Sequence, residues 1–200
     1  MTGDVRITVT RTLTKDQQAR RARLIASAHE LASEGGYAAV TMHDVADRAG
    51  VARATVYRYF ASKDHLLTEV AADWARVFTE LNVPGKSPTA RLSGLLEALV
   101  EVASTNINLT SAVVQATTSQ DSGVEDARTE LFRYVRQQFG AAIDPEETTR
   151  SVSGVSMEDV ESVIGHMVLA ALVSLTALAR PKEEVMAMVR TAARLIVGER

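Results

Sequence analysis

Apolar side chains recur along most of this chain at intervals of three and four residues, the spacing that places them on one face of an α-helix. The pattern predicts a first helix after Thr14, which ends at Gly35 and Gly36 because glycine adopts the left-handed conformation readily. Alternation typical of a β-strand occurs only within residues 1–13. The pattern therefore predicts an all-α protein, with residues 1–13 as a flexible arm.

Capping and turn residues divide the rest of the chain into short helices followed by longer ones. Thr41 is placed to cap a second helix that stops at Gly50, and a third helix is expected over residues 52–60. Ser62 is placed to cap a fourth helix over residues 63–81. The later helices are expected near residues 88–105, 108–119, 122–140, 157–180 and 182–197. This change predicts an N-terminal three-helix domain over residues 14–62 and a larger helical domain over residues 63–200.

The two short helices on either side of Gly50 have the residues that a helix-turn-helix needs. Ala46 is small enough for two helices to cross closely, and Gly50, four residues later, supplies the positive φ of the turn. The third helix can bury Val56 and Phe60 while its other face stays polar. That polar face carries Arg53, Thr55, Tyr57 and Arg58. A helical hairpin inside a core shares the glycine and the small residue, but it less often exposes arginines and tyrosines together.

The segment from Thr41 to Lys63, TMHDVADRAGVARATVYRYFASK, resembles the DNA-binding domain of the tetracycline-repressor (TetR) family of bacterial transcription regulators. The resemblance covers about residues 15–70, and its most specific part is the run ATVYRYFASKDHLL. It implies an N-terminal helix-turn-helix DNA-binding domain and a C-terminal helical domain for ligand binding and dimerisation. The DNA-binding residues that it implies are Thr41, His43, Arg53, Ala54, Thr55, Tyr57, Tyr59 and Lys63.

The resemblance also implies a role for several of these positions. Arg53 is the candidate base reader, because arginine can bond both acceptors of guanine, and Ala54 is placed to pack on a thymine methyl group. Tyr57, Tyr59 and Lys63 are candidate phosphate contacts. Further phosphate contacts are expected from Arg6, Arg11, Arg20, Arg21 and Arg23. Unlike many members, the chain has Ala52 before the recognition helix, and alanine is a poor N-cap that offers no hydroxyl to phosphate.

The composition of the chain excludes several kinds of functional site. The chain of 200 residues has no cysteine, which excludes disulfides, thiolate metal sites and cysteine catalysis. It contains no phosphate-binding glycine loop and no nucleophile–base set in plausible order, so we expect neither an enzyme nor a metal site nor a cofactor. Residues 163–178 form the most apolar stretch, which is shorter than the ~20 residues of a membrane span. We expect a cytoplasmic protein with no membrane partner.

The last two expected helices carry long apolar faces that one monomer does not bury completely. The resemblance implies that they join the same helices of a second subunit in a four-helix bundle, giving a homodimer through residues 157–180 and 182–197. A two-fold axis also suits a DNA reader, because two recognition helices about 34 Å apart require one. The alternative is that both are simply core helices. His166, within the first of them, is interpreted as a core or interface histidine, with ligand contact as the alternative.

Between Leu92 and Phe139, apolar positions are mixed with small polar ones, which suits an apolar ligand cavity with a few orienting groups. The small polar residues are Ser104, Thr105, Asn106, Thr110, Gln115, Thr117 and Thr118. The sequence thus predicts a ligand-responsive repressor that binds a palindromic DNA operator and is released by a small, mainly apolar effector. The tail is similar to that of bacterial repressors of sterol and fatty-acyl catabolism, which implies an acyl-CoA or lipid catabolite. The alternatives are a helical interaction module without DNA binding and a small-molecule-binding protein with a degenerate helix-turn-helix.

Overall fold

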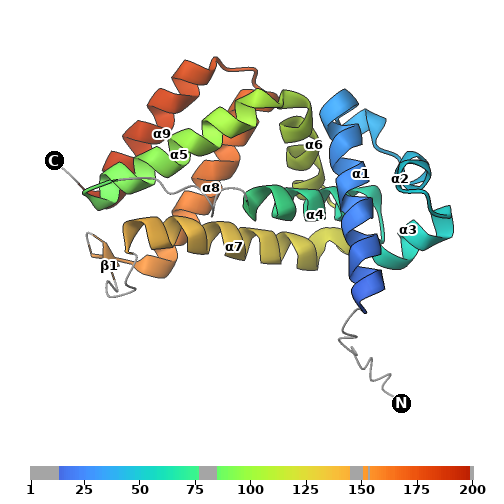
Figure 1. Cartoon of the computed structure of the whole chain (residues 1–200). Helices are drawn as coiled ribbons and strands as arrows, with labels where there is room; N and C mark the ends of the chain where they lie inside the picture. The colour runs from blue at the N-terminus through green and yellow to red at the C-terminus, as the bar shows by residue number, and fades with distance from the viewer. Residues whose placement is uncertain (1–13, 77–84, 145–150, 153, 199–200) are drawn as a thin grey trace, which may run out of the picture.

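The computed structural model of the chain describes residues 14–76, 85–144, 151–152 and 154–198. These residues form nine α-helices and confirm the all-α prediction. The helices are α1 (Lys15–Ala39), α2 (Met42–Ala49), α3 (Arg53–Tyr59), α4 (Lys63–Arg76), α5 (Pro88–Thr105), α6 (Ile107–Thr117), α7 (Glu125–Ile143), α8 (Met157–Thr176) and α9 (Lys182–Val197). Figure 1 shows α1 to α3 at one end of the molecule and α5, α8 and α9 at the other, with α4 and α6 between them. The expected arm over residues 1–13, with Arg6 and Arg11, and the end of the fourth helix over residues 77–81 lie outside the described residues.

Local capping places the first helix boundaries where the sequence predicts them. Thr14 and Gln17 form a capping box at the start of α1. The backbone of α1 leaves helical geometry at Gly35 and at Gly36, where φ is +69°, although one further turn continues to Ala39. Gly50 has a φ of +66° and ends α2 in the left-handed conformation, as predicted. The turn between the two short helices therefore depends on a glycine.

Two details of the larger domain differ from the prediction. A two-stranded antiparallel hairpin, β1 (Ser151–Val152) with β2 (Val155–Ser156), precedes α8. Strands of two residues are too short to produce a recognisable alternation in the sequence. Helix α8 ends at Thr176 rather than at residue 180, because Pro181 disfavours the helical conformation of the residue before it and Ala179 takes a positive φ of 47°.

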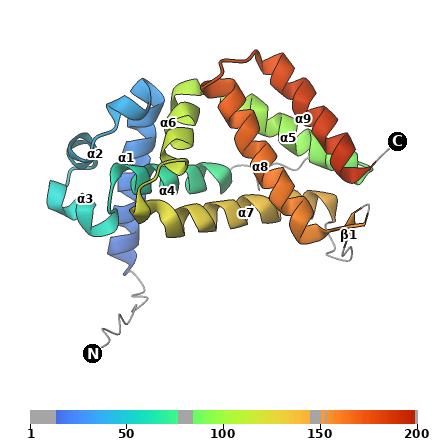
Figure 2. The same ribbon diagram turned by 180° about the vertical axis from the view of Figure 1, so that it is seen from behind.

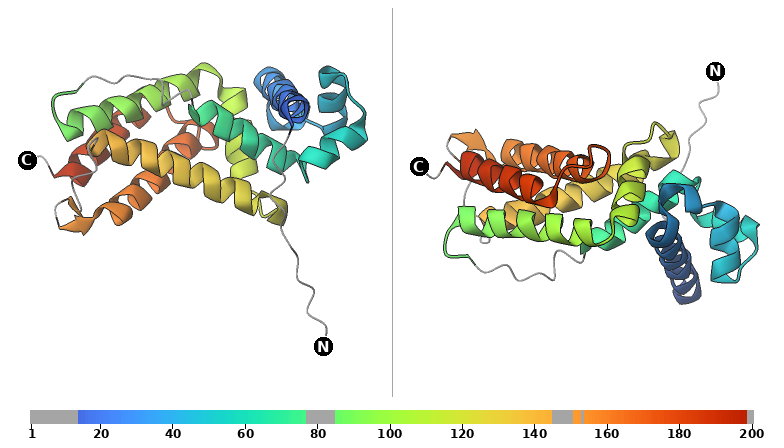
Figure 3. Two further views of the ribbon diagram at one scale, coloured as in Figure 1. Left: turned by 60° about the horizontal axis from the view of Figure 1, so that its bottom comes forward. Right: turned by 90° about the horizontal axis from the view of Figure 1, so that it is seen from above.

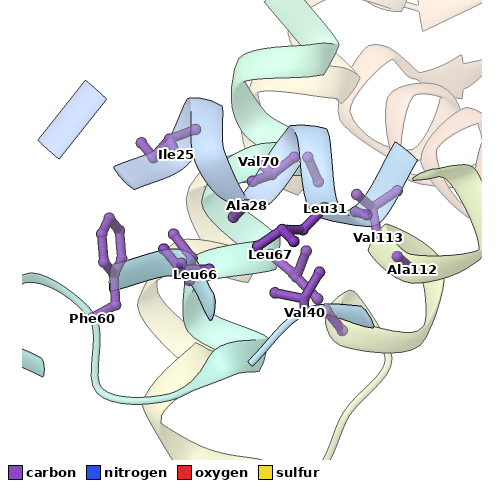
Figure 4. Close-up of a cluster of buried hydrophobic side chains, with 14 of the residues drawn as sticks. Ile25, Ala28, Leu31, Val40, Phe60, Leu66, Leu67, Val70, Ala112 and Val113 are labelled. Atoms are coloured by element: carbon purple, nitrogen blue, oxygen red, sulfur yellow. The ribbon is translucent and has the colours of Figure 1, made fainter. Parts of the chain in front are cut away.

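A first hydrophobic core joins α1, α2 and α3 to α4, α6 and the start of α7. Leu66 and Leu67 of α4 are fully buried, and Leu67 lies in the middle of the cluster that Figure 4 labels. Leu24 of α1 and Val113 of α6 belong to the same core. The predicted domain boundary between residues 62 and 63 therefore separates α3 from α4 along the chain, whereas the core extends across it.

A second hydrophobic core lies among α5, α7, α8 and α9. The view from above in Figure 3 shows α5, α8 and α9 side by side and away from α1 to α3. Two ion pairs hold α9 against α5: Arg190 lies 3.0 Å from Glu97, and Lys182 lies 3.0 Å from Glu101. The C-terminal helices thus form a layer with its own core.

The outer face of α8 and α9 leaves large apolar side chains exposed. Leu195 of α9 is 78% exposed, Val163 of α8 is 55% exposed, and Leu178, just after α8, is 60% exposed. Figure 2 shows both helices on the side turned toward the viewer. Among the described helices, α8 alone is long and apolar enough to cross a membrane by length and composition. It packs against α5, α6, α7 and α9 on one side and leaves its outer face exposed. The exposed apolar residues mark a face that suits a protein partner.

The shared core around α4 predicts the effect of truncating its central leucine. Leu67→Ala should lower the free energy of unfolding by about 3 kcal/mol, because a fully buried leucine leaves a cavity as well as losing its transfer energy. Urea unfolding at fixed protein concentration measures the loss. The matched control is Ile107→Ala, which removes an apolar side chain that is 44% exposed and should cost less than 1 kcal/mol. Equal losses in the two variants would contradict this description of the core.

Candidate nucleic-acid interface and ligand cavity

Helices α2 and α3 are held against the first core by one face each. Met42, Val45 and Ala46 of α2 are buried, as is Val56 of α3, and Phe60 is buried directly after α3. The N–H of Val51 donates to the Ala46 carbonyl, which closes the tight turn. The opposite faces of the two helices consequently point to solvent, as a helix-turn-helix requires.

The structure exposes most of the predicted DNA-binding residues on this surface. Thr41, His43, Arg53, Ala54 and Tyr57 are exposed, whereas Thr55, Tyr59 and Lys63 are half-buried. Ala52 stands at the N-cap of α3 and makes no side-chain capping bond, as expected for alanine. The exposed positions of α3 therefore form one surface, and their contact with DNA stays a prediction.

Arg53 and Tyr57 form a pair on the exposed face of α3. The guanidinium donates to the Tyr57 hydroxyl at 3.3 Å and lies 5.6 Å from the centre of the tyrosine ring. Tyr57 is 47% exposed, so the pair projects from the surface. A guanidinium has five N–H donors, and this single hydrogen bond orients Arg53 while leaving most of its donors free for another partner.

The two predicted residues at the start of α2 already have acidic partners. The Thr41 hydroxyl accepts from the Asp44 N–H at 3.1 Å and donates to the Asp44 carboxylate at 2.5 Å. The ring Nε2 of His43 lies 3.5 Å from an oxygen of Asp47. Contact of either side chain with phosphate requires these partners to be exchanged.

Lys63 lies against α1 rather than in open solvent. Its ammonium donates to the Tyr37 carbonyl at 3.2 Å and lies 3.5 Å from the centre of the Tyr37 ring, and partial burial lowers the pKa of Lys63. The Tyr37 hydroxyl donates to Asp64 at 2.6 Å, and this hydrogen bond raises the pKa of Tyr37 to about 12. Lys63 therefore ties α4 to α1 in this conformation.

The Tyr59 hydroxyl is not presented to a phosphate. It is buried and has no hydrogen-bond partner among the described residues, and the ring packs against the first core. The Tyr59 hydroxyl is therefore not accessible to a phosphate in this conformation, and its contact with DNA stays a prediction.

Arg21, which was predicted as a phosphate contact, forms an ion pair with α4 in this conformation. Its guanidinium lies 2.6 Å from Glu69 of α4, and His65 lies 3.8 Å from the other carboxylate oxygen. His65 and Arg21 together lower the pKa of Glu69 to about 2, although its partial burial acts in the opposite direction. The ring Nδ1 of His65 accepts from the Ala61 N–H at 3.1 Å. This group joins α1, the end of α3 and α4, and the sequence analysis did not single it out because its members are far apart in the chain.

An apolar cavity of about 70 Å³ lies between the two ends of the molecule. Its walls come from five helices: Ala71, Trp74 and Ala75 of α4, Leu99 of α5, Val113, Val114 and Thr117 of α6, six residues of α7 from Leu131 to Phe139, and Gly165, Val168, Leu169 and Leu172 of α8. Helix α4 thus contributes both to this cavity and to the core of the helix-turn-helix.

Of the small polar residues predicted to line a cavity, only Thr117 does so. Its hydroxyl donates to the Val113 carbonyl at 2.8 Å and is therefore already satisfied. The hydroxyls of Ser104, Thr105 and Thr118 donate to carbonyls of their own helices, as the hydroxyl of Thr110 does to the Asn106 carbonyl. Asn106 caps α6, and the exposed Gln115 bonds Ser111. The prediction was wrong for these six residues, because none of them lies in the wall of the cavity.

Within the described residues no group of histidines and carboxylates is arranged to hold a metal ion. What the described residues do bring together is a helix-turn-helix with an exposed arginine and a second helical domain around an apolar cavity. These features define the class of DNA-binding transcription regulators with a ligand-binding domain.

Comparison with known proteins agrees with this class. The family model described as "Bacterial regulatory proteins, tetR family" matches residues 24–70. The transcriptional repressor KstR of Rhodococcus jostii is 33% identical over 142 residues, which are 70% of this chain and 67% of that protein. KstR of Mycobacterium tuberculosis is 29% identical over 92% of this chain and 83% of its own length. The chain therefore belongs to the TetR family.

A solved structure extends the likeness to the whole fold. The crystal structure of a TetR transcriptional regulator from Rhodococcus sp. RHA1 matches with a TM-score of 0.78 and 27% identity. The match covers 94% of this chain and 99% of the other. The C-terminal helices, which lie beyond the segment matched by the family model, thus have the architecture of the family as well.

The charged group around Glu69 predicts how stability depends on pH. The ordinary pKa of Glu69 is 4.5 and its pKa in the folded protein is about 2, so its contribution is complete above pH 4.5 and is lost as the pH falls toward 2. Glu69→Gln should lower the free energy of unfolding at pH 7 by roughly 2 kcal/mol and flatten the acid limb of the stability curve. Urea midpoints between pH 7 and pH 3 measure this, with the exposed Glu130→Gln as the control. An acid limb unchanged by Glu69→Gln would show that this group does not tie α1 to α4.

Proposed function

We propose that this chain is a ligand-responsive transcriptional repressor that binds a palindromic operator as a homodimer and is released by a small, mainly apolar effector. The observation that carries the proposal is the exposed Arg53–Tyr57 pair on α3, in a helix-turn-helix whose core includes a helix of the ligand domain. The relatives are repressors rather than enzymes, which supports a regulatory role without catalysis. A protein with this role acts in the cytoplasm.

On the DNA side, Arg53 is assigned to a base edge and Tyr57 to a phosphate. In a helix-turn-helix, the N-terminal residues of the recognition helix contact the base edges in the major groove. These are the positions that Arg53 and Ala54 occupy in α3. Arg53 stands at the first position of α3 with most of its donors free, so it can form two hydrogen bonds to one guanine. Exposed Ala54 has the size to pack beside a thymine methyl group.

The proposed dimer uses the outer face of α8 and α9. The exposed Val163, Met188 and Leu195 lie on these two helices, and a second copy would cover them. Two copies related by a two-fold axis would present two α3 helices to a palindrome.

The effector is assigned to the apolar cavity. A cavity of about 70 Å³ is smaller than the several hundred Å³ that enclose a drug-sized ligand, so binding requires the surrounding helices to move apart. Trp74 and two alanines of α4 form part of the wall, and α4 follows α3 directly. Expansion of the cavity therefore displaces the helix that positions the recognition helix. A 100-fold fall in DNA affinity corresponds to a coupling of about 2.7 kcal/mol.

The test of DNA reading begins with capture of random duplex DNA by the purified protein at ~150 mM salt. The proposal predicts enrichment of a palindrome, because phosphate attraction alone weakens uniformly with salt. Arg53→Ala should lower affinity for the captured duplex by about 10- to 100-fold, as expected when a guanine contact is lost. Arg133→Ala, an exposed arginine of α7, should leave that affinity unchanged.

Two outcomes would contradict this assignment. Equal losses in Arg53→Ala and Arg133→Ala would show only a general effect of charge. Absence of duplex binding even at ~50 mM salt, where phosphate contacts are strongest, would favour a helical interaction module instead.

A further inference from the structure

A second hollow, open to solvent, adjoins the apolar cavity between α7 and α8. It has a volume of about 240 Å³, and we call it the α7–α8 groove. Thr129, Phe132 and Arg136 of α7 and Ser162, Gly165, His166 and Leu169 of α8 line it. Phe132, Gly165 and Leu169 also line the apolar cavity, so the two spaces share a wall. The groove therefore lies directly beside the cavity, and only these shared residues separate the two spaces.

Arg136 lines this groove, and its guanidinium has no partner among the residues that the structure describes. In the described part of the chain, no hydrogen bond or ion pair joins its guanidinium to another residue, and the residues that line the groove include no carboxylate. The other two arginines of α7 differ, because Arg128 pairs with Glu125 and Arg133 with Glu130. The Arg136 guanidinium beside an apolar wall is complementary to a ligand that has both an anionic group and an apolar part.

The contact between Arg136 and α8 depends on a glycine. A Cβ atom at Gly165 would lie 3.1 Å from the Cγ of Arg136, closer than most such contacts. The absence of a side chain at Gly165 lets the arginine stem lie against α8. The guanidinium is thus placed at the groove by packing of its stem, not by an acidic neighbour.

His166 adds a polar group to the groove, but a neutral imidazole ring does not balance the charge of an anionic ligand. Its Nδ1 lies 2.8 Å from the Ser162 carbonyl, and since a carbonyl only accepts, Nδ1 donates this bond. The neutral ring then presents Nε2 as an acceptor. The exposure of His166 excludes a core role, and Arg136 is left as the group that can pair with an anion.

We propose that the α7–α8 groove binds the anionic head of an amphipathic effector, a carboxylate or a phosphate, while its hydrocarbon part enters the cavity beside Trp74. This inference rests on the proposed function and specifies its ligand chemistry. The guanidinium of Arg136 pairs with the head through its charge, and the exposed side chain of Phe132 covers the start of the tail. A neutral hydrocarbon would use the cavity alone and gain nothing from Arg136.

The experiment uses the fluorescence of Trp74, which is the single tryptophan of the chain and lies in the cavity wall. The full-length protein is titrated with dodecanoate, dodecanoyl-CoA and dodecanol, three probes with matched tails and different heads. Arg136→Gln should weaken binding of at least one of the two anions about 10-fold or more and change dodecanol binding less than 2-fold. The anion that is affected identifies the head as a carboxylate or as the phosphates of the CoA.

Two matched variants separate charge from structure. Arg136→Lys keeps the charge and should retain affinity for the same anion within a few-fold, because lysine still pairs as a point charge. Arg133→Gln removes a charge from α7 outside the groove and should change none of the three titrations.

The inference is overturned if neither anion binds, if Arg136→Gln leaves both anions unaffected, or if it weakens dodecanol equally. Failure of the proposed function itself would appear elsewhere, as absence of operator capture by the wild-type protein without any probe. Operator capture with no effect of Arg136 would reject this head-group site and leave the repressor proposal standing.

Discussion

The packing of α4 into the core of the helix-turn-helix is the constraint on which the rest of the structure depends. Leu66, Leu67 and Val70 are fully buried among side chains of α1, α3 and α6. Because protein cores are close-packed, α4 cannot move without disturbing the helices that hold α3. Two polar contacts add to this packing: Lys63 donates to the Tyr37 carbonyl, and Glu69 pairs with Arg21. Both connect α4 to α1, so the N-terminal helices and α4 behave as one packed unit.

The same helix reaches the cavity one to two turns later. Trp74 and Ala75 face the apolar cavity, while Leu67 faces the first core, so one rigid element contacts both proposed sites. A second connection runs through the short 3-10 helix η2 (Ser122–Val124), which begins α7. A Cβ atom at Gly123 would lie only 3.2 Å from Ala61, in the link between α3 and α4. The cavity is too small for a drug-sized ligand, so binding of such a ligand must displace these packed helices. The small size of the cavity therefore couples ligand binding to a movement of α4 in the proposed mechanism.

Sequence reasoning succeeded where the determinants are local. The capping box at Thr14, the left-handed Gly50 and the apolar stripe of α1 each act within a few residues, so the helix-turn-helix and most helix boundaries were predictable. It failed where direction depends on tertiary packing. The Tyr59 hydroxyl is buried and Lys63 lies over the Tyr37 ring, and neither contact can be predicted from the local sequence pattern. The cavity walls come from five separate helices, so the small polar residues of one stretch were a poor guide to them.

The charge at the α7–α8 groove illustrates the same limit. Arg136 is one of three arginines in α7, and only the structure shows that the other two are paired while this one lies beside the cavity. By contrast, the apolar faces of α8 and α9 were predictable from periodicity, and their exposure in the structure fits the expected use as an interface. Local pattern therefore gives the elements and their buried faces, whereas the chemistry of a site built from several helices requires the fold.

The most direct test of the central claim is to measure operator affinity and cavity occupancy in one sample. The captured palindromic duplex is titrated by anisotropy while Trp74 fluorescence reports binding of dodecanoyl-CoA. The account predicts that affinity for the duplex falls about 100-fold when the Trp74 signal saturates, and, because coupling is reciprocal, that the duplex weakens probe binding by the same factor. A saturated Trp74 signal with unchanged operator affinity would contradict it, since α4 would then carry no coupling between the two sites.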